Sequence, residues 1–166
     1  MRADKIYLVG FMGAGKTSVA REVGRRLDWK TEDIDDRIEA REHKTIREIF
    51  ARHGETYFRD LEREVVAELL PLRHVVVATG GGTFVDADTR ARMKADGAVF
   101  WIDVPLSTLV ERIPLDGSRP LAPNRAILEA LFMQRRPAYA QAHVRLDAAR
   151  AAIGELADMI VEWLGA

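Results

Sequence analysis

The segment from Gly10 to Thr17 constrains the fold more than any other part of the chain. Its sequence, Gly-Phe-Met-Gly-Ala-Gly-Lys-Thr, matches the phosphate-binding loop pattern G-x-x-x-x-G-K-[ST] at every position. The apolar run 6–9 precedes it and predicts a buried strand, and apolar residues spaced by four from Val19 to Leu27 predict a helix after it. This strand–loop–helix context favours a true phosphate loop over a glycine-rich turn with a chance lysine.

The residue types in the loop predict how it binds phosphate. Glycines at Gly10, Gly13 and Gly15 allow the backbone to bend so that successive N–H groups point at phosphate oxygens. The dipole of the following helix adds partial positive charge at the same point. In such a loop, Lys16 reaches the β- and γ-phosphates and the hydroxyl of Thr17 binds Mg²⁺.

Composition and charge narrow the class of protein. The chain has 166 residues, about one domain's worth, and its hydrophobic fraction of 48% and charged fraction of 31% exclude a disordered chain. A net charge of −1 gives no overall attraction to nucleic acid or anionic membrane, and the lack of cysteine excludes disulfides and thiolate chemistry. The first strand leaves no room for a signal peptide, and no apolar run approaches the roughly 20 residues that span a bilayer. A cytoplasmic protein is therefore expected.

Apolar runs and helical patterns alternate along the rest of the chain, with no repeat or linker between them. The predicted strands are 6–9, 29–32, 75–78, 98–102 and 144–146. Helices are predicted between them, including about 87–95, one that Pro105 opens, and about 124–136. This alternation predicts a parallel sheet with right-handed crossovers, in which ligands bind beyond the carboxyl ends of the strands.

Two carboxylates follow the weak strand, at Asp33 and Asp35. Two carboxylates so close together at a strand end should do different jobs. We assign Asp33 to Mg²⁺, through water, and Asp35 to the hydroxyl group that accepts a phosphoryl group. Capping of the next helix by Asp35 or Asp36 is the alternative.

A run of three glycines, Gly80, Gly81 and Gly82, follows the buried strand 75–78. It predicts that the backbone approaches a ligand closely there, with a flexible turn as the alternative. Together with the phosphate loop and the carboxylates, the run places three suggestive segments just after predicted strands. We therefore expect all three to meet at one rim of the sheet.

Arginines are the candidates for binding an anionic substrate. Arg59 lies in a helical pattern with Glu62 three residues on, and Arg135 and Arg136 lie at a predicted helix end before Pro137. Two converging guanidinium groups would bind a carboxylate with charge-assisted hydrogen bonds worth about 1.5–3 kcal/mol each. A plain surface role is the alternative for each arginine taken singly.

Two further arginines flank an irregular, proline-containing segment. Arg119, inside the loop 113–123, is a candidate lid arginine that neutralises the phosphoryl group during transfer. Arg112, at the base of that loop, is a candidate for stacking on adenine.

The ordered set of motifs resembles the shikimate kinase family along essentially the whole chain. The segments that carry the resemblance are the phosphate loop, Asp33-Ile34-Asp35, Phe58-Arg59 with Glu62, Gly80-Gly81-Gly82, Arg119-Pro120-Leu121, and Arg135 ahead of Pro137 and Tyr139. The resemblance implies a P-loop NTPase fold of the nucleoside-monophosphate-kinase-like type, with three α/β/α layers and a five-stranded parallel sheet. It implies a single domain, 1–166, with its core in 1–32, 72–112 and 140–166, a substrate-binding segment at about 33–61 and a lid at about 113–124.

The resemblance also implies an activity, which is transfer of the γ-phosphoryl group of ATP to the 3-hydroxyl of shikimate in aromatic amino acid biosynthesis. It makes Asp35 the base, with Lys16, Mg²⁺ and Arg119 stabilising the transferring group. The implied shikimate-binding residues are Asp35, Arg59, Gly80, Gly81, Gly82 and Arg135. The implied ATP-binding residues are Gly13, Ala14, Gly15, Lys16, Thr17, Ser18, Arg112 and Arg119. Mg²⁺ would be held by Thr17 and, through water, by Asp33.

The expected partners are ATP and shikimate, with the protein acting as a monomer and binding neither nucleic acid nor membrane. A gluconate or nucleoside-monophosphate kinase is one alternative, but the carboxylate pair with Arg59 fits shikimate better. A non-catalytic ligand-binding module of a transcription regulator is another. Such a regulator should carry a helix-turn-helix segment and could lose Lys16 or Asp35, whereas this chain begins in its first strand and has both residues.

Overall fold

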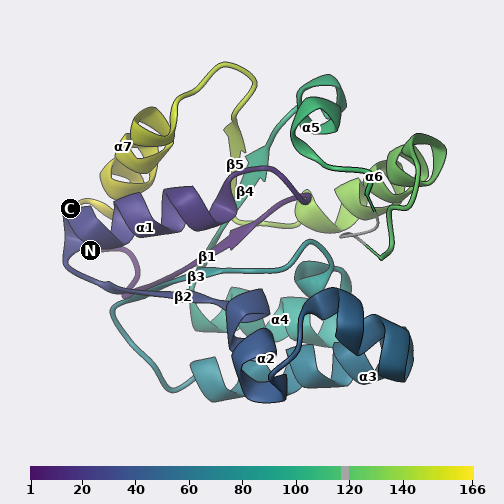
Figure 1. Ribbon diagram of the computed structural model, residues 1–166. Coiled ribbons are helices and arrows are strands. Elements are labelled where there is room, and N and C mark those ends of the chain that lie inside the picture. The colour runs from purple at the N-terminus through teal and green to yellow at the C-terminus, as the bar shows by residue number, and fades with distance from the viewer. Residues whose placement is uncertain (117–119) are drawn as a thin grey trace.

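A computed structural model of the protein describes residues 1–116 and 120–166 (Figure 1). In this part of the chain, five parallel strands form one sheet in the order β2-β3-β1-β4-β5. The strands are β1 (Lys5–Val9), β2 (Lys30–Asp33), β3 (Val75–Ala78), β4 (Ala98–Asp103) and β5 (Val144–Asp147). The predicted five-stranded parallel sheet is confirmed.

Helices cover both faces of the sheet, which confirms the predicted three layers (Figure 1). On one face lie α1 (Lys16–Leu27) and α7 (Ile153–Leu164), and on the other lie α3 (Ile46–Leu69) and α4 (Ala87–Asp96). The other helices are α2 (Ile34–Glu42), α5 (Leu106–Arg112), α6 (Arg125–Tyr139) and the 3₁₀ turn η1 (Thr83–Val85).

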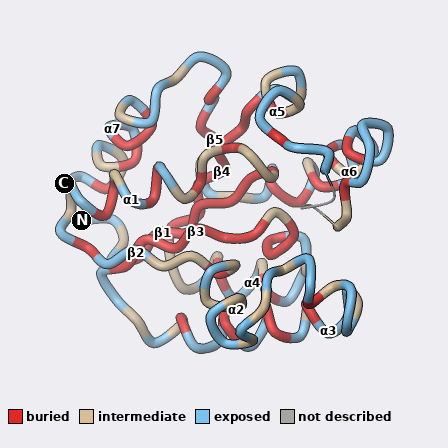
Figure 2. The backbone as a smooth tube through the Cα atoms, in the orientation of Figure 1, coloured by how far each residue is buried: buried red, intermediate tan, exposed pale blue. Residues whose placement is uncertain are grey.

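The core of the molecule lies along the three central strands (Figure 2). Every residue of β1, β3 and β4 is buried, whereas the edge strands β2 and β5 are partly exposed. Burial on both faces explains why the central strands are apolar apart from Lys5 and Asp103 at their ends, whereas the partly exposed β2 is polar. The sheet order puts β1 in the middle, so the loop that follows it emerges at the centre of the carboxyl edge.

The helix that carries both Arg135 and Tyr139 is longer than the sequence predicted. Instead of ending near residue 136, α6 continues through Pro137 to Tyr139. A proline in a helix removes one backbone hydrogen bond, but burial of Ala138 and Tyr139 holds the final turn in place. The helix α3 is broken at Gly54, where φ of 83° and ψ of 179° separate two helical stretches.

The carboxylate that caps α2 is Asp33. Its Oδ1 accepts a hydrogen bond of 3.1 Å from the backbone N–H of Asp36, so the helix begins at Ile34. The alternative in which Asp35 or Asp36 is the cap is therefore wrong. Asp35 itself lies in the first turn of α2, beyond the end of the strand.

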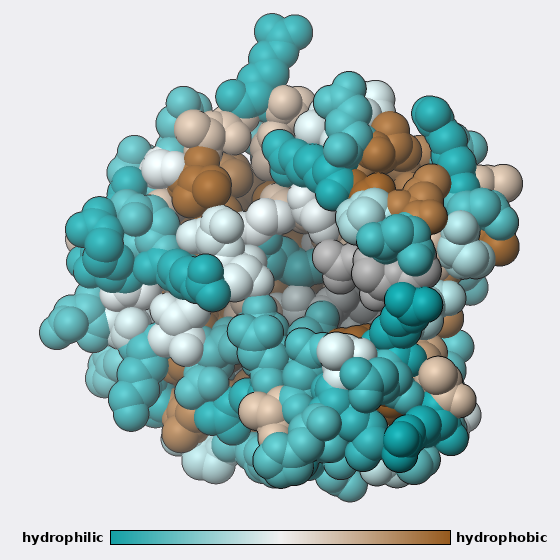
Figure 3. All heavy atoms as spheres, viewed as in Figure 1, coloured by the Kyte–Doolittle hydropathy of each residue, from teal (hydrophilic) through white to brown (hydrophobic). Residues whose placement is uncertain are grey.

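Hydrophilic side chains cover much of the face of the molecule drawn in Figure 3, and hydrophobic ones appear there in small separate groups. The large exposed hydrophobic residues include Leu115, Ile127 and Met133. Among the helices of residues 1–116 and 120–166, none is long and apolar enough to cross a membrane.

Candidate active site

The phosphate loop connects the central strand β1 to α1. Gly13 and Gly15 have φ values of 79° and 94°, a left-handed conformation that side chains disfavour, which confirms why glycine stands there. Lys16 Nζ donates to the backbone oxygens of Gly10, at 2.5 Å, and Phe11, at 3.2 Å, so the ammonium group lies inside the loop. The first N–H groups of a helix have no partner within the helix, and Gly15 at the N-cap of α1 has no side chain to cap them, so they remain available to a ligand in the loop.

A hydroxyl–carboxylate pair stands at the edge of this loop. Thr17 Oγ1 donates a hydrogen bond of 2.7 Å to Asp33 Oδ2. The other oxygen of Asp33 is occupied by the cap of α2, so the carboxylate is held from both sides. Hydroxyl and carboxylate oxygens are the ligands that Mg²⁺ prefers, usually with several waters retained. The donor set therefore fits the predicted Mg²⁺ position, with Thr17 in contact and Asp33 behind a water.

The loop opens onto a hollow that we call the phosphate pocket. Its lining contains the residues Met12, Gly13, Ala14, Gly15, Lys16, Thr17, Ser18, Asp33, Asp35, Thr79, Gly80 and Gly81. These residues come from the ends of β1, β2 and β3 and from the segments just after them. The predicted meeting of three segments at one rim of the sheet is confirmed.

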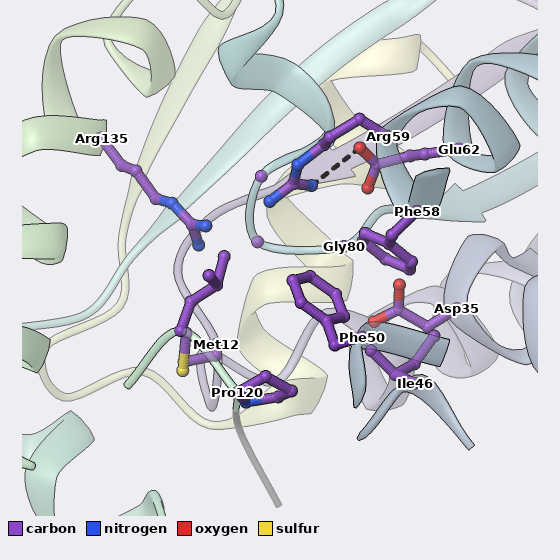
Figure 4. Close-up of a pocket in the computed structure, with 13 residues that line it drawn as sticks. Met12, Asp35, Ile46, Phe50, Phe58, Arg59, Glu62, Gly80, Pro120 and Arg135 are labelled. Atoms are coloured by element: carbon purple, nitrogen blue, oxygen red, sulfur yellow. Dashed lines mark hydrogen bonds and ion pairs between the residues drawn. The ribbon is translucent and has the colours of Figure 1, made fainter. Parts of the chain in front are cut away.

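A second hollow, which we call the acceptor pocket, adjoins the phosphate pocket (Figure 4). Its lining contains Met12, Asp35, Ile46, Phe50, Phe58, Arg59, Glu62, Gly80, Gly81, Gly82, Pro120, Leu121 and Arg135. Apolar side chains form one wall and charged ones stand at the ends. The two pockets share Met12, Asp35, Gly80 and Gly81, so a molecule in the acceptor pocket lies next to a phosphate in the other.

Asp35 stands where the two pockets meet, because it lines both. Its position in the first turn of α2 points the carboxylate toward the glycine run after β3. An ideal Cβ on Gly80 would lie only 2.8 Å from Asp35 Oδ1, so a side chain there would displace the carboxylate. A carboxylate between a phosphate and a bound hydroxyl is suitably placed to orient that hydroxyl or take its proton.

Two arginines reach the acceptor pocket from different helices. In Figure 4, Arg59 of α3 and Arg135 of α6 point toward one another, with Asp35 on the side away from Arg135. Arg135 is only 5% exposed, and burial, together with the charge of Arg59, lowers the pKa of its guanidinium. Arginine stays protonated even so. Two like charges held in a buried pocket favour an anionic ligand.

The neighbouring Arg136 faces away from the acceptor pocket. Its Nη1 donates a hydrogen bond of 2.9 Å to Asp103 Oδ1, and its Cζ lies 4.9 Å from the centre of the Trp101 ring. The sequence predicted Arg135 as the clamp and left open whether Arg136 shares that role. The geometry brings Arg135 alone of the pair into the pocket.

The glycines after β3 make room for these guanidinium groups. An ideal Cβ on Gly81 would lie 2.9 Å from Nη1 of Arg135, and one on Gly82 would lie 2.5 Å from Nη2 of Arg59. Real Cβ atoms almost never approach so closely, so side chains at these positions would push the arginines away. Of the two interpretations of the glycine run, the structure favours close approach over a flexible turn. The side chains nearest to the three glycines are those of charged residues that line the acceptor pocket.

The two predicted arginines near the lid have different outcomes. Arg112 lies against the phosphate loop, where its Nη1 donates to the backbone oxygen of Gly13 at 3.2 Å. Arg119 lies outside the described residues. The next two residues, Pro120 and Leu121, line the acceptor pocket. The described part of the segment 113–124 therefore reaches the site.

The sequence assigned no role to two polar residues beside the site, Tyr139 and Thr83. Tyr139 donates a hydrogen bond of 2.5 Å to the backbone oxygen of Gly81, and burial raises the pKa of its hydroxyl to about 12, so it remains a donor. Tyr139 lies four residues after Arg135, so a helix that continues through Pro137 puts both side chains on the same face. That spacing was the signal in the sequence for Tyr139. Thr83 belongs to no recognised motif, and only its contacts in the folded structure show that it lies beside the site.

The family model described as shikimate kinase matches residues 12–165. A shikimate kinase of Persephonella marina is 44% identical over 143 residues, which are 86% of this chain and 87% of that relative. The solved structure of shikimate kinase from Acinetobacter baumannii in complex with shikimate has a TM-score of 0.92 at 35% identity, covering 97% of this chain and 92% of the other.

A second solved structure, shikimate kinase from Aquifex aeolicus, has a TM-score of 0.88 at 33% identity and covers 97% of this chain and 96% of the other. These likenesses confirm the expected fold type. The match over 12–165 includes all residues that line the phosphate and acceptor pockets. On this similarity of sequence and of fold, the chain belongs to the shikimate kinase family.

Proposed function

We propose that this protein transfers the γ-phosphoryl group of ATP to the 3-hydroxyl of shikimate. The observation that carries the proposal is that the phosphate pocket and the acceptor pocket meet at Asp35. The phosphate loop on one side of Asp35 suits a nucleotide. The two arginines that line the acceptor pocket on the other side suit a hydroxy acid, and the two molecules would lie next to each other. The likeness to a shikimate kinase in complex with shikimate supports the same acceptor.

Shikimate combines a carboxylate, a six-membered carbon ring and hydroxyl groups, and the acceptor pocket offers a partner for each. Arg59 and Arg135 would bind the carboxylate with charge-assisted hydrogen bonds, with the Gly81 backbone beside them. The ring would pack on the apolar wall, where Phe50 and Phe58 lie 4.9 Å apart between ring centres. The hydroxyls would then face Asp35. The two arginines would thus select an acid over a neutral polyol.

In the proposed reaction, the 3-hydroxyl oxygen attacks the γ-phosphorus while Asp35 takes the hydroxyl proton. A bond forms between that oxygen and phosphorus, and the bond from the γ-phosphorus to the bridging oxygen breaks, so ADP leaves with that electron pair. Lys16 and the backbone N–H groups of the loop stabilise the charge on the phosphates. Arg119 remains the predicted lid arginine for the transferring group.

ATP binding is proposed along the phosphate loop. The segment from Gly13 to Ser18 lines the phosphate pocket, and Arg112 lies on the loop beside Gly13, where it is proposed to face the adenine. Mg²⁺ would be held by Thr17 directly and by Asp33 through water. When bound, the ion neutralises negative charge on the phosphates.

The proposal is tested directly by comparing shikimate with the acceptors of the alternative kinases. ADP release is measured with ATP and Mg²⁺ and with shikimate, gluconate or nucleoside monophosphates as acceptor, and the product is identified by mass spectrometry and NMR. We expect ADP release to depend on shikimate and the product to carry its phosphoryl group on the 3-oxygen. ADP release that needs no shikimate, or that follows gluconate or a nucleotide, would contradict the proposal.

We further propose that the protein works as a monomer and in the cytoplasm. The pocket lining comes from one chain, and ATP, the proposed co-substrate, is available in that compartment. Light scattering coupled to size exclusion, at the protein concentration of the assay, tests the monomer. A dimer with full activity would contradict that part of the proposal without affecting the chemistry.

Gly82→Ala is expected to raise KM for shikimate about tenfold, the loss of roughly one charge-assisted hydrogen bond. The backbone of Gly82, with φ of −104°, suits alanine, so the added methyl acts by displacing Arg59 and not by strain. Gly154→Ala is the matched control, because the nearest atom to its ideal Cβ is Arg26 Nη2 at 3.5 Å, an ordinary contact. Steady-state kinetics and melting temperatures are measured for both. An unchanged KM in Gly82→Ala would mean that Arg59 is not held against this glycine.

A further inference from the structure

A fully buried threonine, Thr83, lies directly behind the glycine run, at the start of η1. Its Oγ1 accepts a hydrogen bond of 3.0 Å from the backbone N–H of Gly80 and donates one of 2.8 Å to Glu62 Oε2. One hydroxyl therefore joins the backbone beside the acceptor pocket to a carboxylate on α3.

Glu62 uses its two oxygens for different partners. While Oε2 accepts from Thr83, Oε1 accepts from Arg59 Nη1 at 2.9 Å, as the dashed line in Figure 4 marks. Glu62 as a whole is only 4% exposed. A carboxylate buried to that degree depends on its hydrogen bonds for its position, so what holds Oε2 also decides where Oε1 presents itself to the arginine.

The same hydroxyl also sets the position of the glycine run. An ideal Cβ on Gly80 would lie 3.2 Å from both Glu62 Oε2 and Thr83 Oγ1, as well as 2.8 Å from Asp35 Oδ1. The side of Gly80 that a Cβ would occupy is therefore enclosed by the carboxylate of Asp35 together with the Thr83–Glu62 pair. A shift of this backbone would move the groups that face both ends of the acceptor.

We propose that Thr83 is a positioning residue for the acceptor carboxylate. Its hydroxyl ties the Gly80 N–H to Glu62, and Glu62 holds the Arg59 guanidinium in the orientation that meets the acid. This inference rests on the proposed function, since it concerns the same acceptor pocket. Thr83 lines neither pocket and acts only through Glu62, Arg59 and the glycine run.

The isosteric substitution Thr83→Val separates the hydroxyl from the packing. Valine fills the same volume but leaves Glu62 Oε2 without this donor and the Gly80 N–H without this acceptor. We expect KM for shikimate to rise about tenfold, a change typical of one lost hydrogen bond to a charged group, and KM for ATP to stay within about twofold. Thr83→Ser, which keeps the hydroxyl, should restore KM for shikimate to within about threefold of the original value.

Thr89→Val is the matched control for a purely structural effect. Thr89 is 5% exposed, lies in α4, and donates from its own hydroxyl to Asp86 Oδ2 at 2.8 Å, away from the acceptor pocket lining. Its valine variant should melt at a lower temperature with KM for shikimate unchanged. If Thr83→Val behaved in the same way, with lower melting temperature and unchanged KM, Thr83 would be a stability residue only and the inference would be overturned.

Amide hydrogen exchange at Gly80, measured by NMR without substrates, tests the inference independently of activity. In Thr83→Val the Gly80 N–H should exchange at least about tenfold faster than in the original protein or in Thr83→Ser, while Val76 in β3 keeps its protection. Equal exchange at Gly80 in all three proteins would overturn the inference. If the original protein did not phosphorylate shikimate, the proposed function would fail, and the exchange result would still decide whether Thr83 holds the glycine run.

Discussion

Asp35→Asn is expected to lower kcat about a thousandfold while leaving the affinity for ATP near its original value. Asparagine has the size of aspartate, so it keeps the packing between α2 and Gly80, but it cannot accept the proton of the acceptor hydroxyl. The nucleotide should still bind, because the loop from Gly10 to Thr17 is unchanged. The measurements are kcat from ADP release and the ATP dissociation constant from calorimetry.

The neighbouring Asp36→Asn is the matched control. Asp36 is exposed, lies on the same turn of α2 and lines neither the phosphate pocket nor the acceptor pocket. Its contact with Asp33 uses the backbone N–H, which the substitution keeps. We expect kcat to stay within about twofold. Weakened ATP binding in Asp35→Asn, comparable to its loss of kcat, would contradict the role of base.

Arg135→Met should raise KM for shikimate about a hundredfold or more, because it removes a buried guanidinium that can form two charge-assisted hydrogen bonds with a carboxylate. The melting temperature is expected to stay level or to rise. Burial lowers the pKa of Arg135, which means that the fold disfavours its charge, and methionine fills the site without that cost. Steady-state kinetics and calorimetric melting measure the two effects.

Arg136→Met tests the same substitution one residue later, on a side chain that faces Asp103 and the ring of Trp101. It should leave KM for shikimate within about twofold and lower the melting temperature slightly, because Asp103 keeps Arg145 as a partner. If Arg136→Met raised KM as much as Arg135→Met does, the assignment of Arg135 as the clamp would be wrong.

Much of the fold and part of the site could be predicted from local sequence patterns. The strands β1, β3 and β4 contain continuous apolar runs, because both their faces are buried, and such runs can be recognised without any knowledge of their neighbours. The phosphate loop was equally visible, since its contacts are made by its own backbone and by Lys16 within a few residues. These features depend on short stretches of chain, so a single sequence is enough to predict them.

Boundaries were harder, because competing local preferences are decided by packing. Asp33, Asp35 and Asp36 all suit a helix N-cap, and only the position of β2 against β3 makes Asp33 the cap. Pro137 predicted a helix end, but burial of Tyr139 against the core carried α6 beyond it.

By itself, the sequence determined the class of fold, the phosphate loop and the set of charged residues available for an acceptor, because each depends on residue type and near-neighbour spacing. Only the tertiary structure decided that Arg135 faces the pocket and Arg136 faces Asp103, and that Thr83 stands behind Glu62. Those assignments depend on the rotation of α6 and on the approach of η1 to α3. Such contacts join residues far apart in the chain, and no local pattern encodes the direction from which a distant element arrives.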